Sequence, residues 1–279
     1  MRLVLTLINS LIAVACFSQP YLYGGCVSAC NVKITDTIEV YILAGQSNAA
    51  GVGDTTLISN VRYEGVQDSS FFYDYKTKQW QNYHPGHAFE WGAGFGIEDS
   101  FLKEMYSARH KKQYLIKYAW GGIGLYQVDG MDWNVNSIAE YNYHLKHIIR
   151  MANDNAAQNG HYFLVKAVIW IHGESDANNA TYSAAYRANM DAFVAGLRTH
   201  LKSMSRAYNF PVVLARLKKT SAWGGTTMYD IQTTYCTDGK ATLISTDDAA
   251  IAINPDNVHY STTGLINLGI NIADSLKAN

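Results

Sequence analysis

The chain has 279 residues, of which 48% are hydrophobic and 16% charged, and its formal net charge is −1. This balance is typical of a globular protein with a sizeable core and argues against disorder. A chain so close to neutral gives no electrostatic reason to expect binding to nucleic acid or to an anionic membrane.

The N-terminal segment is typical of a secretory signal. Arg2 gives it a positive start, and residues 3–17 are nearly all apolar, a run too short for a convincing transmembrane span. We expect residues 1–18 to be a signal peptide and the protein to be secreted or periplasmic. In an alternative lipoprotein signal Cys16 would carry the lipid, but Ala13 matches that pattern poorly, and simple secretion is favoured. No later stretch predicts an integral membrane span.

Three cysteines remain after such a cleavage, Cys26, Cys30 and Cys236. An oxidising compartment permits a disulfide, and Cys26 could pair with Cys30, but the odd number leaves the pairing open. The spacing of Cys26 and Cys30, without further Cys or His nearby, does not predict a zinc site. No metal or other cofactor is expected.

Strands and helices are expected to alternate along the chain. Residues 19–35 form a short lead-in, and a single domain is expected over 36–279. Strands are predicted at 38–44, 114–119, 165–171, 211–217 and 241–245, and helices at 97–108, 137–155, 182–203, 227–235 and 262–277. This alternation predicts a parallel sheet covered by helices on both faces. Residues 51–96 lack helical periodicity and are expected to form a long loop, which in a compact domain tends to be functional.

The first predicted strand ends in a turn that suits a nucleophile. The apolar run over 38–44 stops at Gly45, and Ser47 follows two residues later. A glycine-bounded turn after a strand can lift a hydroxyl out of the backbone towards a substrate carbonyl. Gly, Ser and Asn after a strand are also ordinary turn residues, so this stretch alone leaves both interpretations open.

Asp256 and His259 lie three residues apart in the loop before the last predicted helix. This spacing lets the carboxylate accept a hydrogen bond from the imidazole Nδ1, leaving Nε2 to take a proton from a serine. The alternative is a turn aspartate and a histidine that caps the helix. A serine at the carboxyl edge of a parallel sheet, where active sites of such folds lie, favours a catalytic interpretation.

A serine esterase also needs hydrogen-bond donors for the oxyanion of its tetrahedral intermediate. The backbone N–H groups of Ser47 and of Gly121 or Gly122 are candidates. Glycine suits the second position, because a side chain there would block the close approach of the substrate. The alternative for the two glycines is only a tight turn between a strand and a helix.

A polar cluster, residues 172–176, follows the predicted strand over 165–171. Here His172 could donate to the oxyanion, Glu174 could brace the nucleophile loop through backbone N–H groups, and Asp176 could cap the next helix.

The remaining histidines carry no defined role. His144 and His147 are one turn apart on a predicted helix without an apparent third ligand, so they are expected to be ordinary surface residues. His84 and His87 lie in the long loop and could contact substrate.

Four stretches together resemble a known family. They are Gly45-Gln46-Ser47-Asn48, Gly121-Gly122, His172-Gly173-Glu174-Ser175-Asp176 and Asp256-Asn257-Val258-His259. Their order is that of SGNH hydrolases, and within this superfamily the chain is similar over residues 38–276 to the sialate O-acetylesterase and acetylxylan esterase group, carbohydrate esterase family 6. The resemblance implies a three-layer α/β/α sandwich with a flavodoxin-like parallel sheet of about five strands. It also implies metal-free removal of acetyl groups from carbohydrates.

The resemblance also implies roles for individual residues. Ser47 would be the nucleophile, His259 the general base and Asp256 its orienting partner. The oxyanion donors would be Ser47, Gly121, Gly122 and His172. The supporting residues would be Gln46, Asn48 and Glu174. The family usually has Gln where this chain has His172. Loss of one oxyanion donor typically costs about 10²–10³ in turnover, so we expect this departure to affect rate and substrate choice more than reaction type.

The leading hypothesis is a secreted serine esterase that removes O-acetyl groups from carbohydrate through an acetyl-enzyme intermediate. One alternative is a catalytically weak glycan-binding protein on the same fold, with His172 as a mark of decay. Another is an esterase for lipid, thioester or other non-carbohydrate acyl groups. The sequence leaves open which acetylated sugar is bound and what the oligomeric state is.

Overall fold

Strand β1, Asp36–Gly45, lies at the centre of the sheet in the computed structural model, and its residues are buried from Val40 onward. A strand that is apolar on both faces is typical of a parallel sheet with helices on each side. It pairs in parallel with β4, Gln113–Ala119, and with β5, His161–Ile171. These three strands form the buried middle of the domain.

The structure describes residues 33–86, 94–128, 130–204, 206 and 208–277. They belong to one compact unit that spans residues 32–279. The predicted signal peptide, most of the lead-in over 19–35, and Cys16, Cys26, Cys30 and His87 lie outside the described residues.

The sheet has seven strands in the order β3-β2-β4-β1-β5-β6-β7, two more than expected. Strands β6, Val212–Ala215, and β7, Thr242–Ile244, continue it in parallel beyond β5. On the other side β2, Gln67–Asp74, pairs in parallel with β4, and β3, Gln79–Tyr83, pairs antiparallel with β2.

Strands β2 and β3 lie in the segment over residues 51–96, which was predicted to be a long loop. That prediction was wrong for these two strands. β3 is a five-residue edge strand that is buried only at Tyr83, and β2, next to it, is an eight-residue strand in which only about half of the residues are buried. Half-exposed strands do not need the continuous apolar run by which buried strands are recognised in a sequence.

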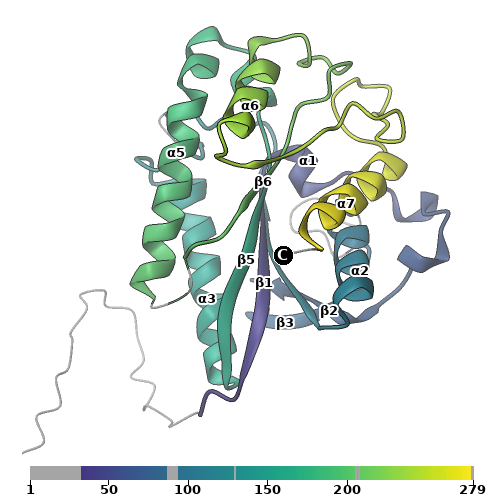
Figure 1. Cartoon of the computed structure of the whole chain (residues 1–279), viewed down its shortest axis with the longest axis vertical. Helices are drawn as coiled ribbons and strands as arrows, with labels where there is room; N and C mark the ends of the chain where they lie inside the picture. Colours follow the sequence, from purple (N-terminus) through teal and green to yellow (C-terminus); the bar gives the residue numbers. More distant parts are fainter. Residues whose placement is uncertain (1–32, 87–93, 129, 205, 207, 278–279) are drawn as a thin grey trace, which may run out of the picture. The chain divides into compact units, whose positions relative to one another are not determined.

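Helices cover both faces of the sheet, which confirms the three-layer arrangement. Figure 1 shows α3 and α5 on one side of the strands and α2 and α7 on the other. The long helices are α2, Glu98–Arg109; α3, Lys146–Gln158; α5, Ala180–Ser203; α6, Thr227–Thr237; and α7, Thr262–Leu276. The short ones are α1, Ser47–Ala50; α4, Glu174–Ala177; the 3₁₀ helices η1, Thr55–Leu57, and η2, Val61–Tyr63; and the π-helix η3, Glu140–Leu145.

The three central strands end level with one another. Gly45, the last residue of β1, is in register with Ala119 at the end of β4 and with Ile171 at the end of β5. Gly45 has a φ of 143°, and a Cβ there would overlap the carbonyl oxygen of Ile171, so only glycine fits this strand end. The segments that begin at Gln46, Trp120 and His172 therefore leave the sheet at one edge.

A buried ion pair supports the turn after β1. Lys117 on β4 donates from Nζ to Glu98 Oε1 at 2.8 Å and to the carbonyl oxygen of Ala50 at 2.5 Å. Both charged side chains are almost fully buried. Removing either one would leave the other as an unpaired buried charge, which strongly destabilises a fold. The C-terminal end of α1 is thus tied to β4 and α2.

Asp99, beside this ion pair, makes the stability of the protein depend on pH. Burial, with the neighbouring Glu98 carboxylate, raises the pKa of Asp99 from 3.8 to about 8. A carboxyl that keeps its proton on folding makes stability fall as pH rises between these values, by at most about 4 kcal/mol from pH 5 to pH 8. We expect Asp99→Asn to lose less stability than the wild type over this range in urea unfolding. The exposed Asp68→Asn should behave as the wild type, and an equal pH dependence for Asp99→Asn would contradict the assignment.

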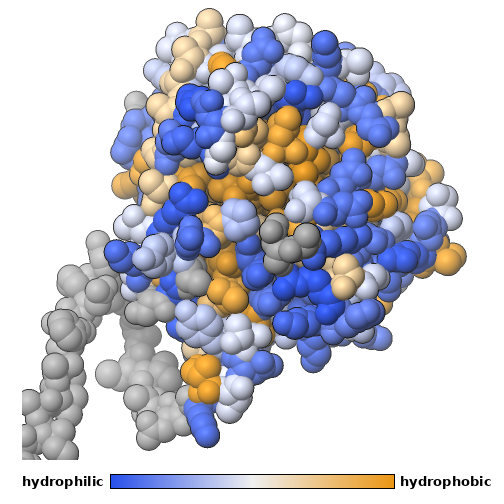
Figure 2. All heavy atoms as spheres, in the orientation of Figure 1, coloured by the Kyte–Doolittle hydropathy of each residue, from blue (hydrophilic) through white to orange (hydrophobic). Residues whose placement is uncertain are grey.

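The surface carries both hydrophilic and hydrophobic residues on the face drawn in Figure 2. Cys236 is a free, half-buried thiol. Among the described residues no helix combines the length and apolar character needed to cross a bilayer.

Candidate active site

Ser47 is the first residue of α1, and only Gln46 separates it from the strand end at Gly45. The turn is held by the N–H of Gln46, which donates to the Ile171 carbonyl at 3.0 Å, and the Gln46 carbonyl accepts the first bond of the helix, from Ala49, at 2.8 Å. Only 6% of Ser47 is exposed. The residue sits at the wall of a cavity of about 430 Å³.

This cavity brings together most of the residues singled out in the sequence. Its lining includes Ser47, Gly121, Gly122, Glu174 and His259, from four segments of the chain. Gln46 also lines it, and its Oε1 accepts a hydrogen bond from the N–H of Ser175 at 3.4 Å. The carboxyl ends of parallel strands are where such folds place their ligands.

His259 is oriented by Asp256. The distance from His259 Nδ1 to Asp256 Oδ2 is 2.7 Å, and Asp256 Oδ1 accepts the N–H groups of Val258 at 2.9 Å and His259 at 3.0 Å. Burial raises the pKa of Asp256, but these hydrogen bonds together lower it below its ordinary value, so the carboxylate is ionised. An ionised carboxylate can only accept, so Nδ1 carries the hydrogen and Nε2 is left to accept a proton.

Asn48 ties the nucleophile turn to the histidine loop. Its Nδ2 donates to Glu174 Oε1 at 2.7 Å and to the Val258 carbonyl at 3.1 Å, and its Oδ1 accepts the N–H of Tyr260 at 3.0 Å. Glu174 was expected to brace the turn through backbone N–H groups, but it acts through the Asn48 side chain. Burial raises the pKa of Glu174, and the hydrogen bond from Asn48 opposes that rise. Asn48 thereby fixes Ser47 relative to His259.

Loss of the Asn48 amide should weaken both stability and activity. Asn48→Ala removes three hydrogen bonds and leaves the buried Glu174 carboxyl without its donor, which typically costs about 1–3 kcal/mol. We expect kcat/KM for an acetyl ester to fall about 10–100-fold, because a misplaced base costs that much. Asn267→Ala removes one side-chain hydrogen bond, to the carbonyl oxygen of Ala250, and neither residue lines the cavity, so it serves as the control in urea unfolding and kinetics. Unchanged activity in Asn48→Ala would contradict the positioning role.

Asp176 holds the segment that carries Gly121 and Gly122. Its carboxylate accepts the N–H of Leu125 at 2.7 Å and of Tyr126 at 2.9 Å. Burial raises the pKa of Asp176 to about 6 against these hydrogen bonds. Asp176 was expected to cap the next helix, but Asn179 caps α5 by accepting from the backbone N–H groups of Thr181 and Tyr182. Asp176 instead positions the glycine segment.

His172 lies behind the cavity rather than in its wall. It is fully buried, and its ring stacks on Trp170 at 4.8 Å and on Tyr186 at 5.9 Å between centroids. Its Nε2 donates to the Ile123 carbonyl at 3.0 Å, since a carbonyl can only accept. Burial lowers the pKa of His172 to about 3, so the ring is neutral. His172 was expected to donate to the oxyanion, but its Nε2 donates to the backbone at Ile123 instead. His172 therefore helps Asp176 to hold the segment that carries Gly121 and Gly122.

Trp223 is a cavity residue that sequence reasoning missed. It lies in a glycine-containing loop between β6 and α6, and Ala222 N–H donates to the Asn257 carbonyl at 2.9 Å, which pins this loop to the Asp256–His259 segment. The feature of the sequence that could have indicated Trp223 is an aromatic residue in a glycine-rich stretch. Its ring gives one side of the cavity an apolar face for a substrate.

The described residues contain no group of three or more His, Cys, Asp or Glu side chains arranged to hold a metal ion. Ser47 and His259 line the cavity although they are more than 200 residues apart in the sequence, and Asp256 is hydrogen-bonded to His259. Two glycines lie beside them, at a position where Gly122 adopts a φ of 77°. This arrangement can carry out acyl transfer through a covalent intermediate.

Comparison with known proteins identifies the family. A family model described as carbohydrate esterase, sialic acid-specific acetylesterase, matches residues 37–278. The chain belongs to this carbohydrate esterase family. A probable carbohydrate esterase from Arabidopsis thaliana is 25% identical over 115 residues, which are 41% of this chain and 41% of that protein.

Solved structures share the fold of this family member. An Arabidopsis thaliana protein matches with a TM-score of 0.66 and 21% identity, over 87% of this chain and 99% of the other. NanS matches with a TM-score of 0.63 and 14% identity, over 86% and 97%. A carbohydrate acetylesterase from Xanthomonas citri matches with a TM-score of 0.53 and 18% identity, over 84% of this chain and 55% of that one.

Proposed function

We propose that this carbohydrate esterase family member is a secreted serine esterase that removes O-acetyl groups from carbohydrates. The observation that carries the mechanism is the shared cavity of Ser47 and His259, with Asp256 at 2.7 Å from the far nitrogen of the imidazole. The family is one of sialic acid-specific acetylesterases, and its relatives include carbohydrate esterases, which supports acetylated carbohydrate as the substrate class. The apolar N-terminal segment supports secretion, or export to a periplasm.

The first half-reaction forms an acetyl-enzyme. Ser47 Oγ bonds to the acetyl carbonyl carbon while its proton passes to His259 Nε2, and Asp256 stabilises the resulting imidazolium. The carbonyl oxygen becomes an oxyanion, for which the N–H of Ser47 and of Gly121 or Gly122 are the proposed donors. Ser47 occupies the first helical position, whose N–H has no acceptor within the helix. The ester C–O bond then breaks, and the sugar oxygen takes the proton from His259.

The second half-reaction releases acetate. A water molecule gives a proton to His259 Nε2 as its oxygen attacks the acetyl carbon. The bond to Ser47 Oγ breaks, the serine recovers its proton and acetate leaves. No metal ion or cofactor takes part in this scheme.

Acetate release tests the proposed function directly. The purified protein is incubated with acetylated xylan, with O-acetylated sialic acid and with p-nitrophenyl acetate, and with p-nitrophenyl octanoate for comparison. We expect acetate from at least one acetylated carbohydrate and faster hydrolysis of the acetyl than of the octanoyl ester. Folded protein that releases no acetate would favour a binding protein, and a preference for the octanoyl ester would favour a lipid esterase.

A further inference from the structure

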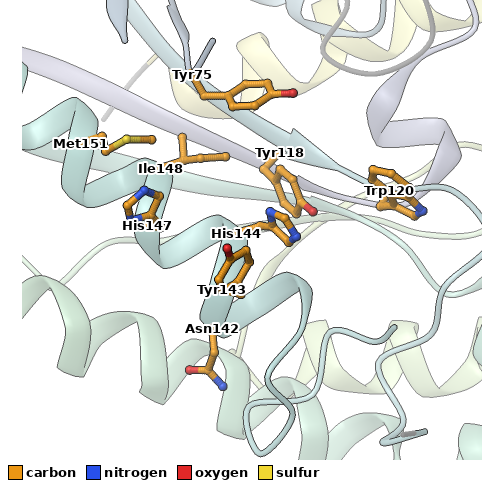
Figure 3. Close-up of a pocket in the computed structure, with 9 residues that line it drawn as sticks. All are labelled: Tyr75, Tyr118, Trp120, Asn142, Tyr143, His144, His147, Ile148 and Met151. Atoms are coloured by element: carbon orange, nitrogen blue, oxygen red, sulfur yellow. The ribbon is translucent and has the colours of Figure 1, made fainter. Parts of the chain in front are cut away.

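A second cavity, of about 360 Å³, opens beside the proposed catalytic cavity. We call it the aromatic cavity, because it is lined chiefly by Tyr75, Tyr118, Trp120, Tyr143, His144 and His147 (Figure 3). None of these residues takes part in the proposed chemistry. Its volume lies within the range of small-ligand sites in proteins.

Trp120 places the aromatic cavity next to the catalytic one. It lines the aromatic cavity, whereas the next two residues, Gly121 and Gly122, line the cavity of Ser47. Its N–H donates to the Gly45 carbonyl at 3.1 Å, so the position of its backbone is fixed at the edge of the sheet. In Figure 3 Trp120 lies at one end of the labelled side chains and Met151 at the other. A substrate with its ester at Ser47 can therefore extend past Trp120.

One wall of the aromatic cavity is the π-helix η3, Glu140–Leu145, which leads into α3. π-Helices are rare and occur often at functional sites. Here the neighbours Tyr143 and His144 both reach the cavity. The ring of His144 stacks on Tyr118 at 5.2 Å and meets the ring of Tyr143 edge-on at 4.9 Å. Tyr118 in turn donates to the buried Glu140 carboxylate, so the stacked rings are held in place.

The chemistry of the lining fits a neutral ligand that is rich in hydroxyl groups. Among the described residues that line it there is no carboxylate, lysine or arginine. Phenol and imidazole groups can each donate and accept hydrogen bonds, as a sugar hydroxyl does. Burial, helped by the nearby charge of Arg150, lowers the pKa of His147, which keeps this imidazole neutral. The exposed ring of Tyr143, 66% accessible, and the ring of Trp120 offer faces on which the C–H side of a pyranose can pack.

We propose that the aromatic cavity binds one neutral pyranose unit of the glycan, next to the unit that carries the acetyl ester at Ser47. This inference rests on the proposed function, because it assigns the second sugar of that substrate to a site of its own. It makes Tyr143 and Trp120 binding residues that favour oligosaccharides over single acetylated sugars.

Binding to the Ser47→Ala protein tests the site without any need for turnover. The probes are four neutral disaccharides, cellobiose, xylobiose, mannobiose and diacetylchitobiose, titrated by NMR and calorimetry. We expect at least one to bind, and Tyr143→Ala in the same background to weaken its Kd about tenfold. Tyr208→Ala is the matched control, since Tyr208 is also an exposed tyrosine, 44% accessible, but does not line the cavity. Failure of all four disaccharides to bind, or equal effects of both substitutions, would overturn the proposal.

Kinetics in the active protein separate a sugar from an aryl occupant. We compare kcat/KM for the acetylated form of the bound disaccharide with kcat/KM for ethyl acetate, which has no sugar. In Tyr143→Ala the ratio of the first to the second should fall about tenfold. A fall in the ratio of phenyl acetate to ethyl acetate, with the sugar ratio unchanged, would overturn the proposal in favour of an aryl site. Disaccharide binding without hydrolysis of any ester would uphold the site and reject the esterase function.

Discussion

Ser47→Ala is expected to lower kcat/KM for acetyl esters by at least about 10⁴-fold, because the hydroxyl is the atom that bonds to the acetyl carbon. Oxyanion donors and substrate binding would leave only a residual rate. The substitution removes a single oxygen at the cavity wall, so the stability of the fold should change by less than about 1 kcal/mol. Kinetics on acetylated carbohydrate, with circular dichroism and urea unfolding, measure the two effects separately.

Ser275→Ala is the matched control for this experiment. The Ser275 hydroxyl donates to the Ile272 carbonyl on α7 at 2.7 Å, and Ser275 does not line the cavity. Its loss should leave kcat/KM unchanged within about twofold. A folded Ser47→Ala protein that keeps more than a small fraction of wild-type activity would show that another group attacks the ester.

His259→Ala is expected to have the second-largest effect, a fall of about 10⁴-fold or more in kcat. Without the imidazole no group accepts the proton of Ser47 as the bond to carbon forms. Asp256→Asn should cost less, about 10²–10⁴-fold, because its carboxylate is 46% exposed and water can replace part of its effect on His259.

Chemical rescue distinguishes loss of the base from loss of structure. His259 is 30% exposed and lines the cavity, so its removal leaves a space that solvent can enter. Added imidazole should restore part of the activity of His259→Ala and none of the activity of Ser47→Ala. Absence of rescue, together with normal stability and a loss of less than about 10² in kcat, would contradict the role of general base.

The parts of the fold that could be predicted from the sequence are those fixed by local pattern. The apolar run of β1 followed by Gly45 predicted a buried strand with Ser47 at its end, and the structure places Ser47 there. The spacing of Asp256 and His259 predicted their hydrogen bond, since it depends on only four residues. The edge strand β3 and its neighbour β2 escaped prediction, because half-exposed strands form their backbone hydrogen bonds without an apolar run in the sequence.

The place of His172 could not be predicted, because it depends on tertiary neighbours. A polar residue directly after a strand was expected to face the substrate. The side chain instead packs against Trp170 and Tyr186, and its hydrogen bond goes to Ile123, which lies 49 positions earlier in the chain. The π-helix that shapes the aromatic cavity was likewise hidden within a predicted α-helix over 137–155. The apolar periodicity of this π-helix is close to that of α3, which follows it.

Covalent trapping tests the central claim most directly. The purified protein is treated with a fluorophosphonate, which reacts with an activated serine, and the modified peptide is identified by mass spectrometry. We predict one adduct, on Ser47, formed in parallel with loss of acetate release and absent from His259→Ala. An enzyme that releases acetate from carbohydrate while Ser47 stays unmodified and another residue carries the adduct would contradict the proposed mechanism.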